Sequence, residues 1–248
     1  MVAVGVFVTR RRVRSPFAGG RWVWLVTRDR LRARFEGQIH ETIKQVALRQ
    51  LAEHGPDGLS INAIARELDV SGPALYRYFA GRDELLTALI IEAYQDLARA
   101  LESAVTPRRG RSTDARLRLF ARAYRQWTLE QPHRYRLLFR PPVPGYDAHA
   151  DALVDAAQRA MTVLLDILRD TPTRSRRRAA SGRDLAGWIE RHDVPDDAAP
   201  HATQAIVIWT RLHGLVSLEI DGNYASVGLD PAPLYASEVA HAIDQYLP

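Results

Sequence analysis

The chain has 248 residues, of which 46% are hydrophobic, no cysteine and a formal net charge of +5. The length allows one large domain or two small ones, and the lack of cysteine excludes disulfides and thiolate metal sites. This composition fits the reducing cytoplasm. The two N-terminal apolar stretches, Met1–Val8 and Trp22–Val26, fall short of the roughly 18 apolar residues that a membrane span needs. A secretory signal carries its charges before the apolar run, and here they follow it. We therefore expect neither a signal peptide nor a membrane partner.

The positive charge is concentrated at the N-terminus. Residues 1–34 hold nine arginines and one aspartate, whereas residues 35–105 sum to −5 and residues 106–248 to +2. The tail, residues 1–35, has two explanations: a disordered basic arm, or a start assigned too early, with translation beginning near Val26. As an arm, its arginines 28, 30, 32 and 34 could enter a DNA minor groove; they could equally form a solvated helix start.

Two helices are predicted at the start of the next segment. The first begins at Glu36, where apolar residues start to recur at intervals of three and four, and ends at the breaker cluster His54–Gly58. Ser60 is placed to cap a short second helix. The apolar positions of the two helices are Ile39, Ile43, Val46, Ala47, Leu51, Ile64, Ala65 and Leu68.

A tight connection, Leu68–Val70, then leads to a further short helix. Ser71 is a second cap-like residue, and Pro73 falls in the first turn of a helix that we expect to run to Phe79. A longer helix follows, with acidic residues in its first turn, as the helix dipole favours. One longer helix and two short ones joined by three or four residues form a helix-turn-helix pattern, and this predicts a DNA-binding domain over residues 36–97.

The remainder, residues 98–248, is helical in pattern and shows no alternating strand signal. We therefore predict an all-α fold with a second, C-terminal helical domain. The helix around 202–220 is apolar almost all round, which indicates burial on more than one side. Helices are expected over 115–130, 133–139, 150–168, 184–190, 202–220 and 234–247, with a loop at 141–145 and a polar connection at 171–178.

The stretch from Ile43 to Ile90 resembles the DNA-binding domain of the TetR family. The resemblance rests on the runs LSINAIARELDVS, ALYRYF and RDELL and on the glycine-containing break before them. The run IWTRLHGLVSLEIDG also resembles a subgroup of this family marked by a Trp, a His and a Gly, here Trp209, His213 and Gly214. The chain departs from the family in having Arg82 where a lysine is usual, and in its longer N-terminal tail.

The resemblance implies roles for the residues of the helix-turn-helix. The small residues after Ser71, together with Arg77, would face the major groove, while hydroxyl groups and Arg82 would contact phosphates. Ser60 and Ser71 are expected to cap helices in any case, Asn62 is equally well read as a solvated side chain, and Phe79 points inward. The implied DNA-contacting set is Ser60, Asn62, Ser71, Gly72, Pro73, Ala74, Tyr76, Arg77, Tyr78 and Arg82.

In the C-terminal domain the resemblance implies a dimer interface and an effector pocket. Each of these residues could instead belong to the core of a monomer. A pocket lined by aromatic and aliphatic groups suits an apolar or aromatic small molecule. The implied interface residues are Leu212, Leu215, Val216, Val239 and Ile243, and the implied pocket residues are Tyr124, Trp127, Phe139, Met161, Leu165, Trp209 and His213.

These features predict a ligand-responsive repressor that binds a palindromic operator as a homodimer and requires no cofactor or metal. An enzyme is the rival class, but the chain lacks a cysteine nucleophile, a glycine-rich phosphate loop and a metal-spaced histidine pair. A helical adaptor that has lost DNA binding is the second rival. The intact Tyr76–Phe79 group argues against it.

Overall fold

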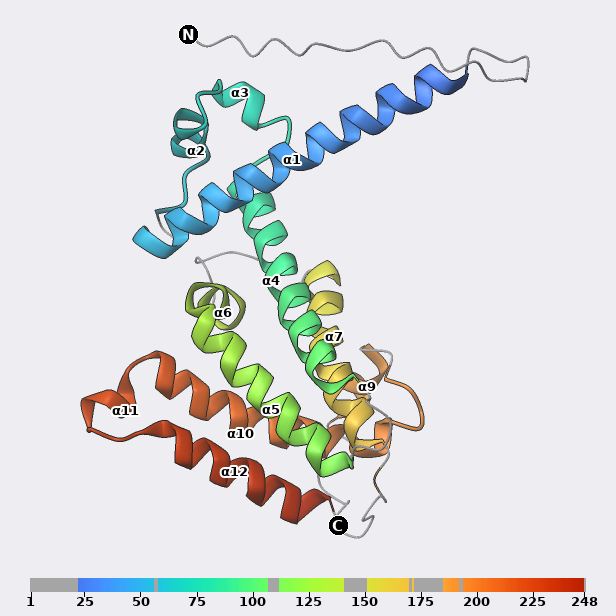
Figure 1. Cartoon of the computed structure of the whole chain (residues 1–248), viewed down its shortest axis with the longest axis vertical. Coiled ribbons are helices and arrows are strands. Elements are labelled where there is room, and N and C mark those ends of the chain that lie inside the picture. The colour runs from blue at the N-terminus through green and yellow to red at the C-terminus, as the bar shows by residue number, and fades with distance from the viewer. Residues whose placement is uncertain are drawn as a thin grey trace. The chain divides into compact units, whose positions relative to one another are not determined.

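The computed structural model describes residues 22–55, 58–106, 112–140, 151–169, 171, 185–191 and 194–247. The chain divides into two compact units, one ending at Ile43 and the other beginning at Lys44. Every regular element in these ranges is a helix (Figure 1), which confirms the predicted all-α class. The predicted loop at 141–145 and most of the connection at 171–178 lie outside the described residues.

The first helix, α1, runs from Trp22 to His54 and crosses the boundary between the two units. It begins well before Glu36 because no glycine or proline interrupts residues 22–36, and arginine, leucine and alanine favour a helix. Positions 28–34 are therefore helical, which agrees with the predicted helix start at these arginines and not with a disordered arm. Gly55 ends the helix with φ of +71° and donates its amide to the Leu51 carbonyl at 3.0 Å.

Three helices follow: α2 (Ile61–Glu67), α3 (Gly72–Leu75) and α4 (Arg82–Val105). The prediction of a helix from Pro73 to Phe79 is wrong in its length. Beyond Leu75 the chain continues as tighter turns, because the amide of Arg77 bonds to the carbonyl of Ala74, at 3.4 Å, instead of that of Pro73. As predicted, α4 carries Asp83 and Glu84 in its first turn.

The C-terminal helices agree closely with the predicted ranges. The predicted start of the last helix is wrong by three residues, since α12 begins at Pro231. The carboxylate of Asp230 caps it, accepting from the Ala232 amide at 3.0 Å, and the first helical position suits a proline. The short α11, which follows Gly222, was not predicted. The elements are α5 (Thr113–Glu130), α6 (Pro132–Phe139), α7 (Asp151–Leu168), α9 (Ala186–Arg191), the 3₁₀ turn η3 (Ala199–His201), α10 (Ala202–Ile220), α11 (Asn223–Ser226) and α12 (Pro231–Tyr246).

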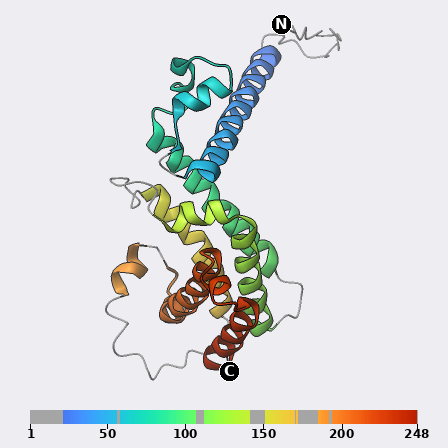
Figure 2. The same ribbon diagram turned by 90° about the vertical axis from the view of Figure 1, so that its left-hand side faces the viewer.

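The core of the C-terminal helices forms around α4. This helix packs along α7 and α5, and α10 packs beside α12 (Figures 1 and 2). Leu97 and Leu101, four residues apart on α4, are buried in one core cluster with Phe120 and Tyr124 of α5. Within the described ranges no helix is both long and apolar enough to cross a membrane.

Candidate functional site

The N-terminus of α2 is held by two side chains. The hydroxyl of Ser60 accepts a hydrogen bond from the Ala63 amide at 3.3 Å, which confirms the predicted cap. The amide of Ser60 donates to Oε1 of the buried Gln50 on α1 at 3.2 Å, and Arg49 of α1 forms an ion pair with Glu67 of α2. These contacts attach α2 to the last turns of α1.

The turn between α2 and α3 depends on Asp69. This residue has φ of +52°, in the left-handed region. Its amide donates to the Arg66 carbonyl at 3.3 Å, and the Val70 amide donates to the Ala65 carbonyl at 3.0 Å. This pair of bonds is a Schellman motif, which ends one helix and redirects the chain into the next. Aspartate tolerates the left-handed conformation better than most residues.

We expect replacement of Asp69 by valine to lower the free energy of unfolding by about 1–2 kcal/mol, because a β-branched residue is strained there. Replacement by glycine should leave the stability unchanged or raise it, since glycine adopts this conformation freely. Urea unfolding of the two variants tests this. Equal destabilisation by valine and glycine would contradict the role assigned to the turn.

The outward side of α3 forms a polar reading surface, which we define as Asn62, Ser71, Pro73, Tyr76 and Arg77, all exposed. A β-carbon at the half-buried Gly72 would lie 3.5 Å from Oδ1 of Asn62, so α2 and α3 contribute to one surface. The opposite side of the turn holds Leu75 and Phe79, 2% and 5% exposed, as predicted.

Two of the implied DNA-contacting residues interact within the chain, and a third lacks the capping bond expected of it. Ser71 occupies the N-cap position of α3, but its hydroxyl makes no capping bond, contrary to expectation. Tyr78 and Arg82 are half-buried and already interact within the chain. Arg77 is therefore the one long basic side chain on the reading surface. Arginine with guanine is the commonest specific contact to a base edge.

A second cluster lies among the C-terminal helices, and we call it the aromatic cluster: Tyr124, Tyr135, Phe139, Trp209 and His213. The Nδ1 of His213 lies 3.0 Å from the hydroxyl oxygen of Tyr124 and 3.4 Å from that of Tyr135. The Trp209 ring stacks on the His213 ring with their centroids 6.1 Å apart. The Phe139 ring meets the His213 ring edge-on, with 4.6 Å between centroids.

Burial favours the uncharged form of the three polar groups at the centre of this cluster, His213, Tyr124 and Tyr135. Burial lowers the pKa of His213 and raises the pKa of Tyr124 well above its ordinary value. When Nδ1 accepts from a tyrosine hydroxyl, the proton of the neutral imidazole sits on Nε2. The cluster can therefore present aromatic faces together with a hydrogen-bond donor at Nε2 of His213.

The aromatic cluster contains four of the seven predicted pocket residues: Tyr124, Phe139, Trp209 and His213. Trp127 is directed elsewhere, and its indole Nε1 donates to Asp96 at 2.9 Å. Met161 and Leu165 lie on α7, in the same hydrophobic core as Tyr124, Phe139 and Trp209. Tyr135 was missed, although it lies four residues before Phe139, a spacing that places both on one helix face.

Because burial lowers the pKa of His213, we expect the stability of the chain to depend on pH. The folded chain binds this proton less readily than the unfolded chain, so stability is greatest above the ordinary histidine pKa of about 6.5 and falls as the pH drops below it. His213→Asn, which keeps an acceptor near Tyr124, should reduce this slope between pH 7.5 and 5.5. Thermal melts across this range measure it, and His133→Asn at an exposed position of α6 is the control. An unchanged slope in His213→Asn would contradict the assignment.

The predicted interface on α10 and α12 is wrong in most of its residues. Leu212, Val216, Val239 and Ile243 are buried in the chain's own core, 1%, 0%, 6% and 7% exposed, because their spacing places them on the inner side of each helix. Leu215 alone is half-buried.

The opposite side of these two helices is their outer face, which we define as Arg211, Gly214, Leu215, Leu218, Leu234, Glu238 and His241. Leu218 and Leu234 are 46% and 42% exposed. Arg211 donates to Glu238 at 3.2 Å and so joins the two helices. A shallow depression on this face is lined by Arg211, Leu215, Glu238 and His241, and the space beyond Gly214 is open.

Residues 43–89 match the family model described as bacterial regulatory proteins, tetR family, and residues 117–242 match a tetracyclin repressor-like C-terminal domain. The HTH-type transcriptional regulator Rv1816 of Mycobacterium tuberculosis (strain ATCC 25618 / H37Rv) is 32% identical over 225 residues, covering 81% of this chain and 89% of that protein. The chain belongs to the TetR family. The match to residues 43–89 contains the whole reading surface, and the match to 117–242 contains the aromatic cluster.

Other TetR relatives agree with this assignment. The uncharacterized HTH-type transcriptional regulator Rv0681 of the same strain is 27% identical over 190 residues, covering 77% of this chain and 74% of that protein. The crystal structure of the regulatory protein SCO4313 has a TM-score of 0.74 at 36% identity, covering 86% of this chain and 98% of that one. PfmR from Thermus thermophilus shares the fold, with a TM-score of 0.52 at 17% identity. The match covers 82% of this chain and 97% of PfmR. The chain is thus a DNA-binding transcriptional regulator of a non-enzymatic family.

Proposed function

We propose that this TetR-family regulator is a repressor that binds a palindromic operator as a homodimer and is released by a small aromatic effector. It acts on DNA in the bacterial cytoplasm. The observation that carries the proposal is the reading surface, where exposed Tyr76 and Arg77 follow a short helix that starts with small residues. In this arrangement the backbone approaches the base edges closely, Arg77 reads a guanine, and Tyr76 binds a phosphate.

The dimer forms through the outer face of α10 and α12. A two-fold axis sets the same patch of each chain against itself, so exposed Leu218 and Leu234 become buried and open Gly214 permits close approach of the helices. Two reading surfaces related by this axis contact successive major grooves, about 34–36 Å apart, and the operator is correspondingly palindromic.

The effector binds at the aromatic cluster. Uncharged His213 and the rings of Trp209 and Phe139 favour a neutral aromatic molecule that accepts a hydrogen bond from Nε2 of the histidine. Trp209, His213 and Gly214 are the three residues that mark the resembled subgroup. We assign Trp209 and His213 to the effector site and Gly214 to the dimer interface. The same run of α10 would then serve both roles from opposite sides.

The test begins with a screen of neutral aromatic compounds, in which ligands of the wild-type chain are found by the rise in its melting temperature. A true ligand of the cluster should fail to stabilise Trp209→Ala. Calorimetric titration of that ligand with and without operator then measures the coupling, which is reciprocal and typically about 5–150-fold in affinity. Equal ligand affinity in both titrations would contradict release by an effector.

A further inference from the structure

The short helix α6 contacts both the aromatic cluster and α4. Tyr135 and Phe139 reach His213 from one side of α6. From another side, Nη1 of Arg134 donates to Oδ2 of Asp96 at 3.0 Å, and its Nη2 lies 3.6 Å from Oε1 of Glu92. A molecule that binds in the aromatic cluster and displaces α6 would therefore move Arg134 relative to α4.

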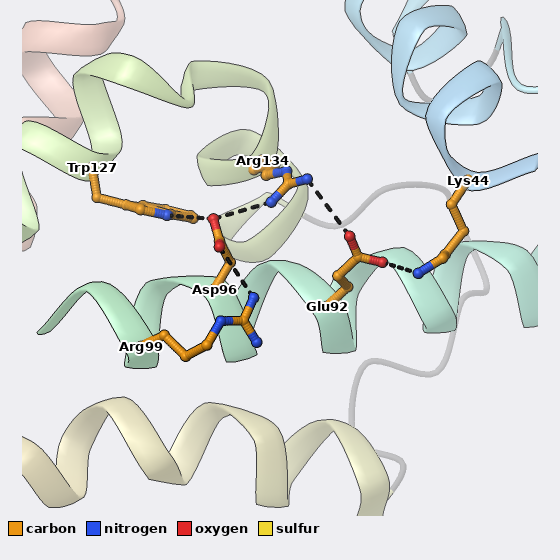
Figure 3. Close-up of polar contacts among 6 residues, drawn as sticks. All are labelled: Lys44, Glu92, Asp96, Arg99, Trp127 and Arg134. Atoms are coloured by element: carbon orange, nitrogen blue, oxygen red, sulfur yellow. Dashed lines mark hydrogen bonds and ion pairs between the residues drawn. The ribbon is translucent and has the colours of Figure 1, made fainter. Parts of the chain in front are cut away.

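Glu92 also contacts α1. Its second carboxylate oxygen pairs with Nζ of Lys44, which is the only lysine in the chain. Figure 3 shows Glu92 between the two cations, with Arg134 shared between Glu92 and Asp96. Lys44, Glu92 and Arg134 are only 19–23% exposed, so solvent and salt screen these ion pairs less than they screen pairs at the surface.

The other carboxylate of this network is held in a fixed place. Besides Arg134, Asp96 accepts from the Trp127 indole of α5 and from Arg99 one turn along α4 (Figure 3). Burial by itself would raise the pKa of Asp96, but Trp127, Arg134 and Arg99 together lower it. Asp96 is therefore an anchored negative charge, and Glu92 is its neighbour four residues away on the same helix.

We propose that Arg134 is the positioning residue that transmits the state of α6 to the DNA-reading helices through Glu92 and Lys44. This rests on the proposed function. When Arg134 withdraws, the carboxylates of Glu92 and Asp96 lose their shared cation and repel each other, as like charges four apart on a helix do. That repulsion disturbs α4 where Lys44 is bound. Lys44 lies on the part of α1 whose Gln50 and Arg49 hold α2.

The test is a double-mutant cycle on operator affinity, measured without effector on the DNA that the wild-type chain selects. Arg134→Gln and Lys44→Met should each weaken binding about tenfold. The double variant should be no weaker than the weaker single variant, because both act through Glu92. The control is Arg159→Gln, which breaks a bidentate pair with Glu102 on the same α4, at 2.6 and 2.7 Å. It should change affinity less than about twofold and combine additively with Arg134→Gln.

Melting curves establish that each variant is folded at the assay temperature. If Arg134→Gln does not fold, Glu92→Gln replaces it, since it removes the shared charge at constant size and should give the same loss. Full additivity of Lys44→Met with Arg134→Gln, or wild-type affinity in Arg134→Gln, would overturn the proposal. A wild-type chain that selects no DNA would instead overturn the proposed function.

Discussion

Replacing Gly214 by tryptophan should convert the proposed dimer into a monomer and weaken operator binding by about 10²–10⁴-fold, because joining two reading surfaces supplies avidity of this size. Gly214 lies on the exposed side of α10 with open space beyond it. A β-carbon at this position would have no neighbour within 4 Å in its own chain, and a large side chain would occupy the place where the partner helix would approach. Light scattering measures the dissociation, and a fluorescence titration of operator measures the affinity.

A matched control exists in the same chain. Gly187 also lies in a helix, α9, and likewise has open space around it. Gly187→Trp should remain dimeric and bind operator like the wild type, so an effect confined to Gly214→Trp assigns the interface to the outer face of α10. A Gly214→Trp variant that stays dimeric, or a wild type that is already monomeric at micromolar concentration, would refute this interface.

The second large effect is expected at Arg77. Arg77→Ala should cost about 1–3 kcal/mol against the preferred operator and relax base preference at one position in each half-site. The reason is that the guanidinium is the one long donor on the reading surface, beside small Gly72, Pro73 and Ala74. Affinities for a series of single-base operator variants measure the change in preference. Arg66→Ala, at an exposed arginine of α2, is the control.

Tyr76→Phe separates the two kinds of contact. It removes a hydroxyl assigned to a phosphate, so it should weaken binding to every operator variant alike. Arg77→Ala should instead weaken only those that carry the preferred base. If Arg77→Ala weakened all sequences equally, Arg77 would be a phosphate contact and the base-reading role assigned to it would be wrong.

The sequence predicted elements well where local rules decide them. The helix at 202–220 agrees with α10, because a long apolar run is a strong helical signal in an all-α chain. Ser60 was recognisable as a cap from its position alone. The length of α3 could not be predicted in this way. The helix ends after Leu75 because the Arg77 amide bonds to the Ala74 carbonyl in the folded chain.

The interface residues were mispredicted for a different reason. An apolar helix such as α10 has two buried sides if it dimerises. The spacing of its apolar residues does not show which side faces the chain's own core and which side faces a partner. The most apolar positions, Leu212 and Val216, turned out to face the core. The outer face is a mixture of leucine, glycine and charged residues that no local pattern marks.

The polar network of Lys44, Glu92 and Arg134 could not be predicted from the sequence either. Lys44 and Glu92 are 48 residues apart, and Arg134 is further along still. Each looks like an ordinary solvated charge on an amphipathic helix. Only the packing of α1, α4 and α6 brings these three side chains together, and nothing in local spacing predicts that packing.

The most direct test of the central claim is selection of binding sites from random double-stranded DNA by the purified chain. Enriched sequences should form a palindrome with half-sites whose centres lie about 10 base pairs, or a multiple of the helical turn, apart. Mass measurement of the complex should find an even number of chains on each site. Failure to enrich any sequence, or enrichment of a lone half-site bound by a single chain, would contradict the account of this protein as a dimeric operator-binding regulator.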